Sequence, residues 1–111
     1  MQKDEIIIFE NQNIKLEVNM KDETAWLTQA QMEKLFDRYE KTISKHIKNA
    51  FNEEINEKSN SQKMRIAKSD KPISIYSLDV IISIGYRVKS KNGIIFRRWA
   101  NQVLKEYFVK M

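Results

Sequence analysis

A short segment in the first half of the chain carries side chains that suit recognition of a polyanion. Lys45 and Lys48 are three residues apart, so a helix would place them on one face, beside Ser44 and Asn49. Ammonium groups bind phosphate oxygens, while hydroxyl and amide groups can hydrogen bond to base edges. The alternative is that these four side chains are exposed to solvent on the helix surface and bind no ligand.

The surrounding residues predict two helices joined by a tight turn. Thr28 is a suitable N-cap, and Gln31 three residues later completes a capping box. Residues 37–41 are the predicted turn, and Thr42 is expected to open or cap the second helix. The buried stripe of the second helix is predicted from apolar spacing at Ile43, Ile47, Ala50 and Phe51. This pattern is typical of a helix-turn-helix, whose second helix enters the DNA major groove.

A basic β-hairpin is predicted downstream of the two helices. Residues 63–68 and 73–76 favour strands, and the intervening Ser-Asp-Lys-Pro sequence favours a turn. Two strands just after a recognition helix occupy the position of the wing in a winged helix. The predicted DNA contacts from the turn, the second helix and the wing are Arg38, Lys41, Thr42, Ser44, Lys45, Lys48, Asn49, Lys63, Arg65, Lys68 and Lys71.

The N-terminal part is expected to be mainly β. Residues 5–18 predict a β-hairpin with a loop of about three to four residues, because apolar and polar residues alternate in its second half. Residues 20–24 are read as a charged loop, and residues 25–27 as a brief extended segment. Residues 53–62 are polar and predict a loop or a frayed helix end.

The last third is expected to be helical. Ser77 can cap a helix over residues 78–89, in which Gly85 costs helix stability and therefore suggests a close crossing with another helix. Residues 91–93 are read as a break before a final helix over residues 94–109. The fold class predicted for residues 1–111 is α+β, a single winged helix-turn-helix domain with an N-terminal β-hairpin and two C-terminal helices.

Composition excludes several kinds of chemistry. The 111 residues include one histidine and no cysteine, so a disulfide, a thiolate metal site and a histidine cluster are all excluded. The acidic pairs at residues 22–23 and 53–54 lie in polar sequence without an apolar pocket that would raise a pKa, which argues against acid–base catalysis. We expect no enzyme activity and no cofactor or metal. The absence of a long apolar run and of a signal-peptide pattern indicates a cytoplasmic location and no membrane partner.

The charge of the chain is unevenly distributed. The net charge is +5, but residues 1–60 contribute −3 and residues 61–111 contribute +8. A basic half favours an anionic partner, most simply nucleic acid. The alternative is a lysine-rich solvated surface of the kind that many cytosolic domains have.

The C-terminal helices leave two questions open. Arg97 and Arg98 could bind phosphates or form structural ion pairs with Asp79 or Glu106, and the same ambiguity applies to Arg87. The final helix carries more apolar surface than a domain of this size easily buries. It could pack entirely in the core, contribute with the other C-terminal helix to a homodimer interface, or support a further domain.

Several blocks of the sequence resemble the N-terminal region of the RhuM family, bacterial proteins described as virulence or DNA-binding proteins. The matching blocks are residues 26–32, 42–49, 76, 78–79, 81–88, 96–97, 99–100 and 102–107. Family members are usually longer, so the resemblance implies that this chain is the N-terminal domain of a larger protein. They tend to have glycine where this chain has Asp37, a turn position that often requires a left-handed backbone. The amino-acid sequence of residues 38–41 also differs from the family pattern.

The resemblance and the residues together predict binding of double-stranded DNA, with a regulatory role in a bacterial or phage-derived context. Two alternatives remain. The chain could be a protein-interaction or dimerisation module that has the helix-turn-helix shape without using it, or the targeting domain of a larger enzyme or toxin.

Overall fold

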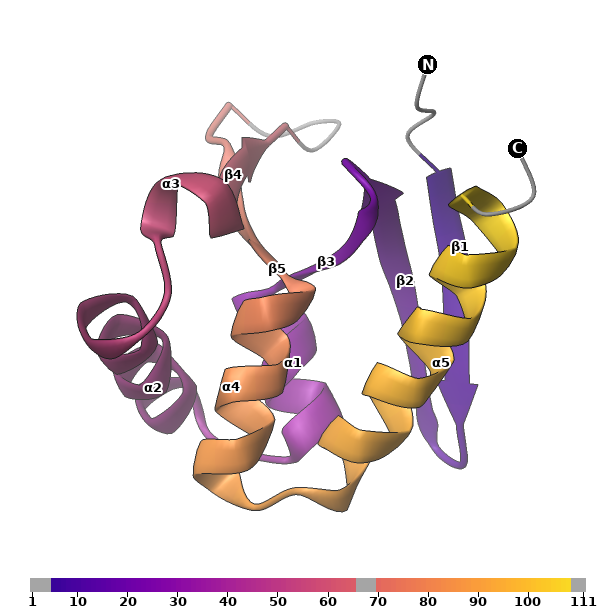
Figure 1. The fold of residues 1–111 in the computed structure, drawn as a ribbon. Coiled ribbons are helices and arrows are strands. Elements are labelled where there is room, and N and C mark those ends of the chain that lie inside the picture. The colour runs from indigo at the N-terminus through magenta and orange to yellow at the C-terminus, as the bar shows by residue number, and fades with distance from the viewer. Residues whose placement is uncertain (1–4, 66–69, 109–111) are drawn as a thin grey trace.

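The computed structural model describes residues 5–65 and 70–108 of the chain. It has an α+β architecture that combines five helices with a five-stranded antiparallel sheet (Figure 1). The strands are β1 (Glu5–Asn11), β2 (Ile14–Lys21), β3 (Thr24–Thr28), β4 (Ser61–Met64) and β5 (Ile73–Ser77). The helices are α1 (Gln29–Phe36), α2 (Glu40–Glu53), α3 (Glu57–Asn60), α4 (Leu78–Val88) and α5 (Lys91–Phe108).

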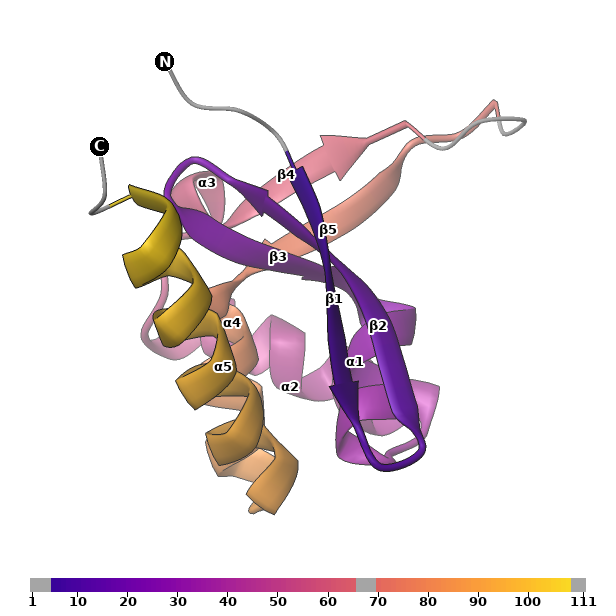
Figure 2. The same ribbon diagram turned by 90° about the vertical axis from the view of Figure 1, so that its right-hand side faces the viewer.

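The sheet joins two β-hairpins that are far apart in the sequence. Its strand order is β1-β2-β3-β5-β4, so β3 pairs with β5 and connects the N-terminal strands to the β4–β5 hairpin. In this pairing Leu27 lies opposite Tyr76, and Trp26 lies opposite Ser77. Figure 2 shows the β4–β5 hairpin extending away from the body of the molecule, on the side opposite α5. The expected N-terminal hairpin is therefore confirmed, and the short extended segment around Trp26 is an inner strand of the sheet.

Local sequence signals explain where α1 begins and ends. The Thr28 hydroxyl accepts a hydrogen bond from the Gln31 backbone N–H, and the Gln31 side chain accepts one from the Thr28 N–H. This is the predicted capping box, which satisfies two backbone donors at the helix start. Asp37 ends the helix in the left-handed region at φ 54°, so the position does have the conformation for which glycine is the usual choice. An acidic side chain there is tolerated better than most.

Several predicted boundaries were wrong. α2 begins at Glu40 rather than Thr42, because the Ile43 N–H already bonds to the Tyr39 carbonyl, and an acidic residue in the first turn favours a helix start. The N-terminal hairpin turns through two residues, Gln12 and Asn13, rather than three or four. The predicted charged loop over residues 20–24 contracts to residues 22–23, because β2 and β3 pair up to Lys21 and Thr24.

The polar segment after α2 and the break before the last helix also differ from expectation. Residues 57–60 form the short helix α3, and β4 starts at Ser61 and ends at Met64, so part of the predicted strand over residues 63–68 lies outside the described residues. α5 starts at Lys91 instead of residue 94. The chain turns at Lys89, which has φ 53°, and the Asn92 side chain donates to the Leu35 carbonyl, which holds the first turn of α5 in place.

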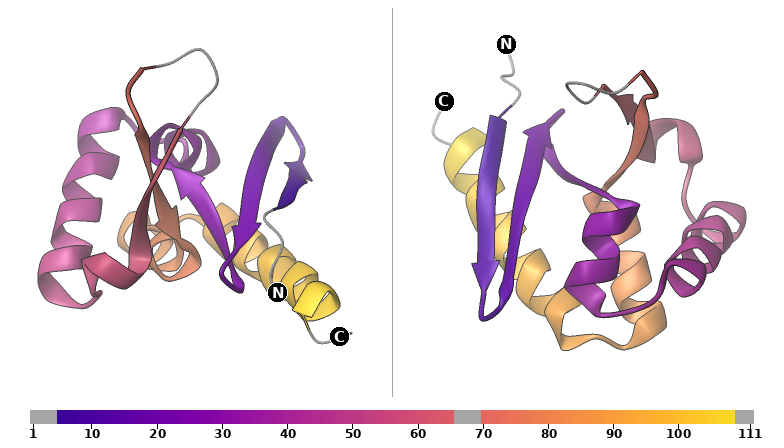
Figure 3. Two further views of the ribbon diagram at one scale, coloured as in Figure 1. Left: turned by 90° about the horizontal axis from the view of Figure 1, so that it is seen from above. Right: turned by 180° about the vertical axis from the view of Figure 1, so that it is seen from behind.

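The core lies between the sheet and the helices. Phe9 of β1 packs edge-on against Phe96 and Trp99 of α5, with ring centroids 5.1 and 5.2 Å apart. These contacts attach α5 to the N-terminal hairpin, as Figure 3 also shows from above and from behind. Gly85 of α4 meets Gly93 of α5, since a Cβ at Gly85 would lie 3.3 Å from the Gly93 Cα. The predicted close crossing at Gly85 is confirmed, and its partner is the N-terminal turn of α5.

Candidate nucleic-acid interface

The second helix presents a basic stripe to solvent. Ile43, Ile47 and Ala50 are buried on one side of α2. Lys41, Lys45 and Lys48 follow one another at helical spacing on the opposite side, and all three are exposed. We call this row of three lysines the α2 lysine stripe. Within the described residues no ion pair or hydrogen bond engages their side chains, so the charges are available to an anionic ligand.

Polar side chains border the α2 lysine stripe. Ser44 is exposed, whereas Thr42 and Asn49 are half-buried at the sides of the helix. A hollow next to the stripe is lined by Gln29, Ser44, Ile47, Lys48, Phe51, Asn52, Glu57 and Tyr76. These residues come from α1, α2, α3 and β5, so the hollow joins the exposed face of α2 to the base of the β4–β5 hairpin. Hydrogen-bonding groups are therefore concentrated beside the positive charges.

Three polar residues near the α2 lysine stripe were not among the predicted site residues. Asn52 is exposed and extends the stripe by four residues beyond Lys48, a continuation that the helical spacing of the sequence already contained. Gln29 is the first residue of α1, and its amide nitrogen lies 3.3 Å from the Glu40 carbonyl at the start of α2. Tyr39, in the turn between the helices, is 86% exposed. Neither Gln29 nor Tyr39 had a signal beyond its position next to a predicted helix.

Arg38, a predicted DNA contact, hydrogen bonds to backbone carbonyls of the protein itself. One guanidinium nitrogen donates to the carbonyls of Phe36 and Asp37 at 2.9 and 3.1 Å, and the other donates to the Val88 carbonyl at 2.9 Å. These acceptors are at the C-terminal ends of α1 and α4, where backbone carbonyls lack helical partners. Arg38 therefore connects two helix ends, and its guanidinium is already engaged by backbone carbonyls.

The structure describes the predicted wing except for residues 66–69. Lys63, Arg65 and Lys71 are exposed on the β4–β5 hairpin, and the Lys63 ammonium donates to the Ser74 hydroxyl at 2.7 Å. Lys68, a further predicted contact, lies outside the described residues. The structure thus places three of the four basic residues predicted for the wing on one exposed hairpin.

An ion-pair network attaches the end of α2 to α4. The Arg87 guanidinium lies 2.9 Å from the Glu54 carboxylate and 3.7 Å from that of Glu53. Hydrogen bonds from Ser83 and then Arg87 lower the pKa of Glu54, so this carboxylate stays ionised and is a poor general acid. The alternative readings of Arg87 are thereby resolved in favour of a structural role. Within the described residues no ion pair joins Arg97 or Arg98 to Asp79 or Glu106.

His46 lies between this network and the α2 lysine stripe. It is half-buried, and its Nδ1 is buried without a hydrogen-bond partner among the described residues. Burial lowers the pKa of His46 below the ordinary value of 6.5, and the positive charges of Arg87 and Lys45 lower it further. The folded protein therefore favours the neutral imidazole.

Stability should consequently fall on mild acidification because of His46. The unfolded chain takes up a proton as the pH falls through about 6.5, whereas the folded chain resists protonation until a lower pH, so acid favours unfolding in this window. We expect urea unfolding midpoints measured between pH 7.5 and 5 to fall less steeply for His46→Gln than for the wild type. The contribution of Glu54 begins only near its own ordinary pKa of 4.5, at lower pH. Parallel pH profiles for the two proteins would contradict this assignment.

The described residues contain neither a membrane-spanning helix nor a cluster of metal ligands. No helix within residues 5–65 and 70–108 combines the length and hydropathy that crossing a membrane requires. In the same part of the chain, no three His, Cys, Asp or Glu side chains come together in a way that could hold a metal ion.

Comparison with known proteins identifies a family. The family model described as virulence protein RhuM family matches residues 50–111, which is more than half of the chain. The matched residues begin near the end of α2 and include the β4–β5 hairpin, α4 and α5. No curated protein and no solved structure matches the chain.

Proposed function

The chain belongs to the virulence protein RhuM family, and we propose that it is a winged-helix protein that binds double-stranded DNA. In this proposal α1 and α2 form the helix-turn-helix, α2 is the recognition helix, and the β4–β5 hairpin is the wing. The order of elements supports this assignment. A strand, β3, precedes α1 and α2, the two wing strands follow, and β5 returns to pair with β3.

The observation that carries the proposal is the α2 lysine stripe. A helix of 14 residues is long enough to span the width of the major groove. Its outer side offers three ammonium groups that no ion pair engages within the described part of the chain. Its buried side is fixed to the core by Ile43, Ile47 and Ala50, so the stripe is held in one orientation. A rigid helix with positive charges along its free side fits the phosphate-lined groove of a duplex.

Individual roles follow from position and chemistry. Lys41 and Lys45 would bind phosphates, while Ser44, Lys48 and Asn52 next to the hollow would face base edges, and Thr42 and Asn49 would contact the groove walls. The exposed hydroxyl of Tyr39 could donate to a phosphate near the turn. The proposed wing residues Lys63, Arg65, Lys68 and Lys71 would neutralise flanking phosphates. The proposed activity is binding without catalysis, with a regulatory role in a bacterial or phage-derived context.

Selection from a pool of random duplexes tests this function. The purified protein is incubated with the pool at low salt, bound duplexes are recovered, and the sequences are compared after several rounds. We expect the protein to retain duplex DNA and to enrich a short sequence motif, of a length that one helix can read in the major groove. If the pool is retained no better than by an unrelated basic protein, and no sequence is enriched, the proposed function is wrong.

The wing should contribute affinity without specificity. Arg65→Ala removes one cation that faces flanking phosphates in the proposal, so the slope of log affinity against log salt should become shallower by about one unit. The enriched sequence should stay the same, because the wing reads no base. The measurement is a fluorescence anisotropy titration at a series of salt concentrations, and a changed sequence preference would assign base contacts to the wing instead.

A further inference from the structure

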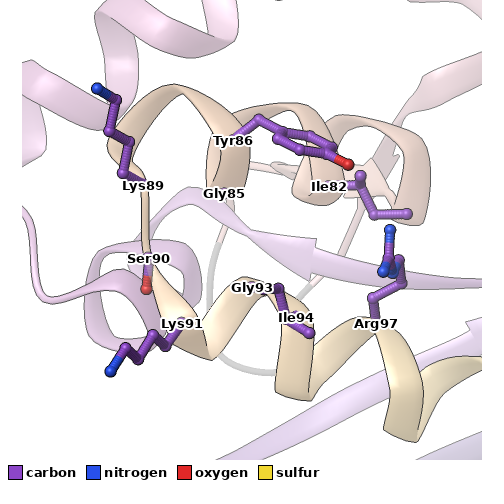
Figure 4. A pocket seen from close by; sticks show the side chains of 9 residues that line it. All are labelled: Ile82, Gly85, Tyr86, Lys89, Ser90, Lys91, Gly93, Ile94 and Arg97. Atoms are coloured by element: carbon purple, nitrogen blue, oxygen red, sulfur yellow. The ribbon is translucent and has the colours of Figure 1, made fainter.

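A ridge of apolar side chains on α4 faces solvent. Tyr86 is 72% exposed, and Ile82 beside it is half-buried. Both residues line the hollows on the two sides of the helix, so they stand between these hollows as a ridge. Figure 4 shows the Tyr86 ring beside Ile82, with Arg97 pointing toward them from α5. An aromatic side chain exposed to this extent next to an apolar neighbour is typical of an association surface.

The ridge has opposite charges at its two ends. Asp79 lies in the first turn of α4, and Lys89 directly follows its last residue. Residues 79, 82 and 86 are spaced by three or four, so they form one stripe along the helix, and Lys89 follows as the left-handed residue that ends it. Both charged side chains are exposed, and within the described residues no ion pair or hydrogen bond engages either of them. The two charges are about 15 Å apart along the helix axis.

We propose that α4 docks antiparallel on α4 of a second copy of this chain, about a two-fold axis between Ile82 and Tyr86. In this arrangement each Asp79 faces Lys89 of the second copy, and each Tyr86 packs against Ile82 of the second copy. A parallel arrangement would instead place Asp79 against Asp79 and Lys89 against Lys89. The charge order along α4 therefore selects the antiparallel dimer, in which the same patch is used by both copies.

The hollow between α4 and α5 supplies the rest of the contact. Its lining includes Gly85, Gly93 and Ile94, and Ile94 is 48% exposed. The two glycines meet at the α4–α5 crossing, where a Cβ at Gly85 would lie 3.3 Å from the Gly93 Cα. The tip of Tyr86 from the second copy would pack against the surface of this crossing, beside Ile94. Lys91 and Arg97 also line this hollow. Their positive charges border the apolar contact and would repel those of the second copy, an effect that salt screens.

The dimer leaves the proposed DNA surface free. α2 packs toward α4 with its buried side, through Ile43, Ile47 and Ala50 and through the Arg87 ion pairs. The α2 lysine stripe is on the opposite side of that helix. If the proposed function holds, two copies would present two recognition helices related by a two-fold axis, and the bound site would consist of two inverted half-sites.

Charge reversal tests the dimer. The wild type should show a mass that rises toward that of two chains in sedimentation or light-scattering measurements as its concentration increases. Asp79→Lys and Lys89→Asp should each raise the dimer dissociation constant about tenfold or more, because each creates two like-charge contacts per dimer. The double variant D79K/K89D reverses both charges and should restore association. Aspartate suits position 89, whose φ is 53°.

The controls separate the dimer from folding and from DNA binding. Lys34→Asp changes the charge as Lys89→Asp does, but on α1, and should not alter association. Tyr86→Glu should be monomeric with an unchanged circular dichroism spectrum. A wild type that stays monomeric at every concentration overturns the proposal. It is also overturned if the double variant associates as weakly as the single variants.

The dimer and the proposed function can fail separately. A monomer that binds duplex DNA refutes only the dimer, and a dimer without DNA affinity refutes only the proposed function.

Discussion

Replacing both Lys45 and Lys48 with glutamate should weaken the affinity for duplex DNA by at least about a hundredfold. Each substitution removes a positive charge that faces the duplex in the proposal, a phosphate contact at Lys45 and a base contact at Lys48, and adds a repulsive charge at the centre of the proposed interface. Both side chains are exposed and without ion-pair partners among the described residues, so the fold should not change. The measurement is an anisotropy titration of the wild type and the variant against the same labelled duplex, at one salt concentration.

A variant with the same overall charge separates this effect from general electrostatics. Lys34→Glu together with Lys105→Glu changes the net charge equally, but these exposed lysines lie on α1 and α5, outside the proposed interface. The control should lose only a small part of the affinity, through the weaker long-range field. An equal loss in both double variants would show that binding depends on net charge and not on the α2 lysine stripe.

Replacing Gly85 with valine should lower the free energy of unfolding by about 3 kcal/mol, at the upper end of the usual cost of overpacking a core. A Cβ at this position would already lie 3.3 Å from the Gly93 Cα and 3.4 Å from the Phe36 ring. Valine adds two methyl groups beyond that contact, and α5 cannot move away without separating its buried Phe96 from the core. Urea unfolding of the purified variant measures the loss.

Gly85→Ala is the matched control for this substitution. The added methyl group crowds Gly93, but alanine also gains about 1 kcal/mol of helix stability over glycine. The two effects oppose one another, so the alanine variant should remain within about 1 kcal/mol of the wild type. If valine proves as harmless as alanine, the two helices do not cross at the distance that the structure shows.

Elements with a local signal could be predicted from the sequence. The capping box of Thr28 and Gln31 depends on residues three apart, and the left-handed conformation of Asp37 follows from its place at the end of a short helix. The close helix crossing was predicted because Gly85 is costly inside a helix unless another backbone needs the space. For the candidate site, the spacing of apolar residues in α2 was enough to place Lys45 and Lys48 on its exposed side.

Features that depend on distant residues could not be predicted in this way. Arg38 looked like a DNA contact because it is basic and lies in the turn, but its acceptors include the Val88 carbonyl, 50 residues away. The start of α5 was misplaced because Asn92 and Gly93 resemble a chain break, whereas Asn92 in fact bonds to the Leu35 carbonyl. The pairing of β3 with β5, which places the β4–β5 hairpin beside α2, likewise has no local signature.

The salt dependence of DNA binding by the wild-type protein tests the central claim most directly. Lys41, Lys45, Lys63, Arg65, Lys68 and Lys71 would together neutralise about six phosphates, which predicts a slope of log affinity against log salt near −5. The measurement is an anisotropy titration with one duplex over a series of salt concentrations. A steep negative slope close to this value supports DNA binding through the α2 lysine stripe and the wing. An affinity that salt does not change, or no binding even at low salt, would contradict it.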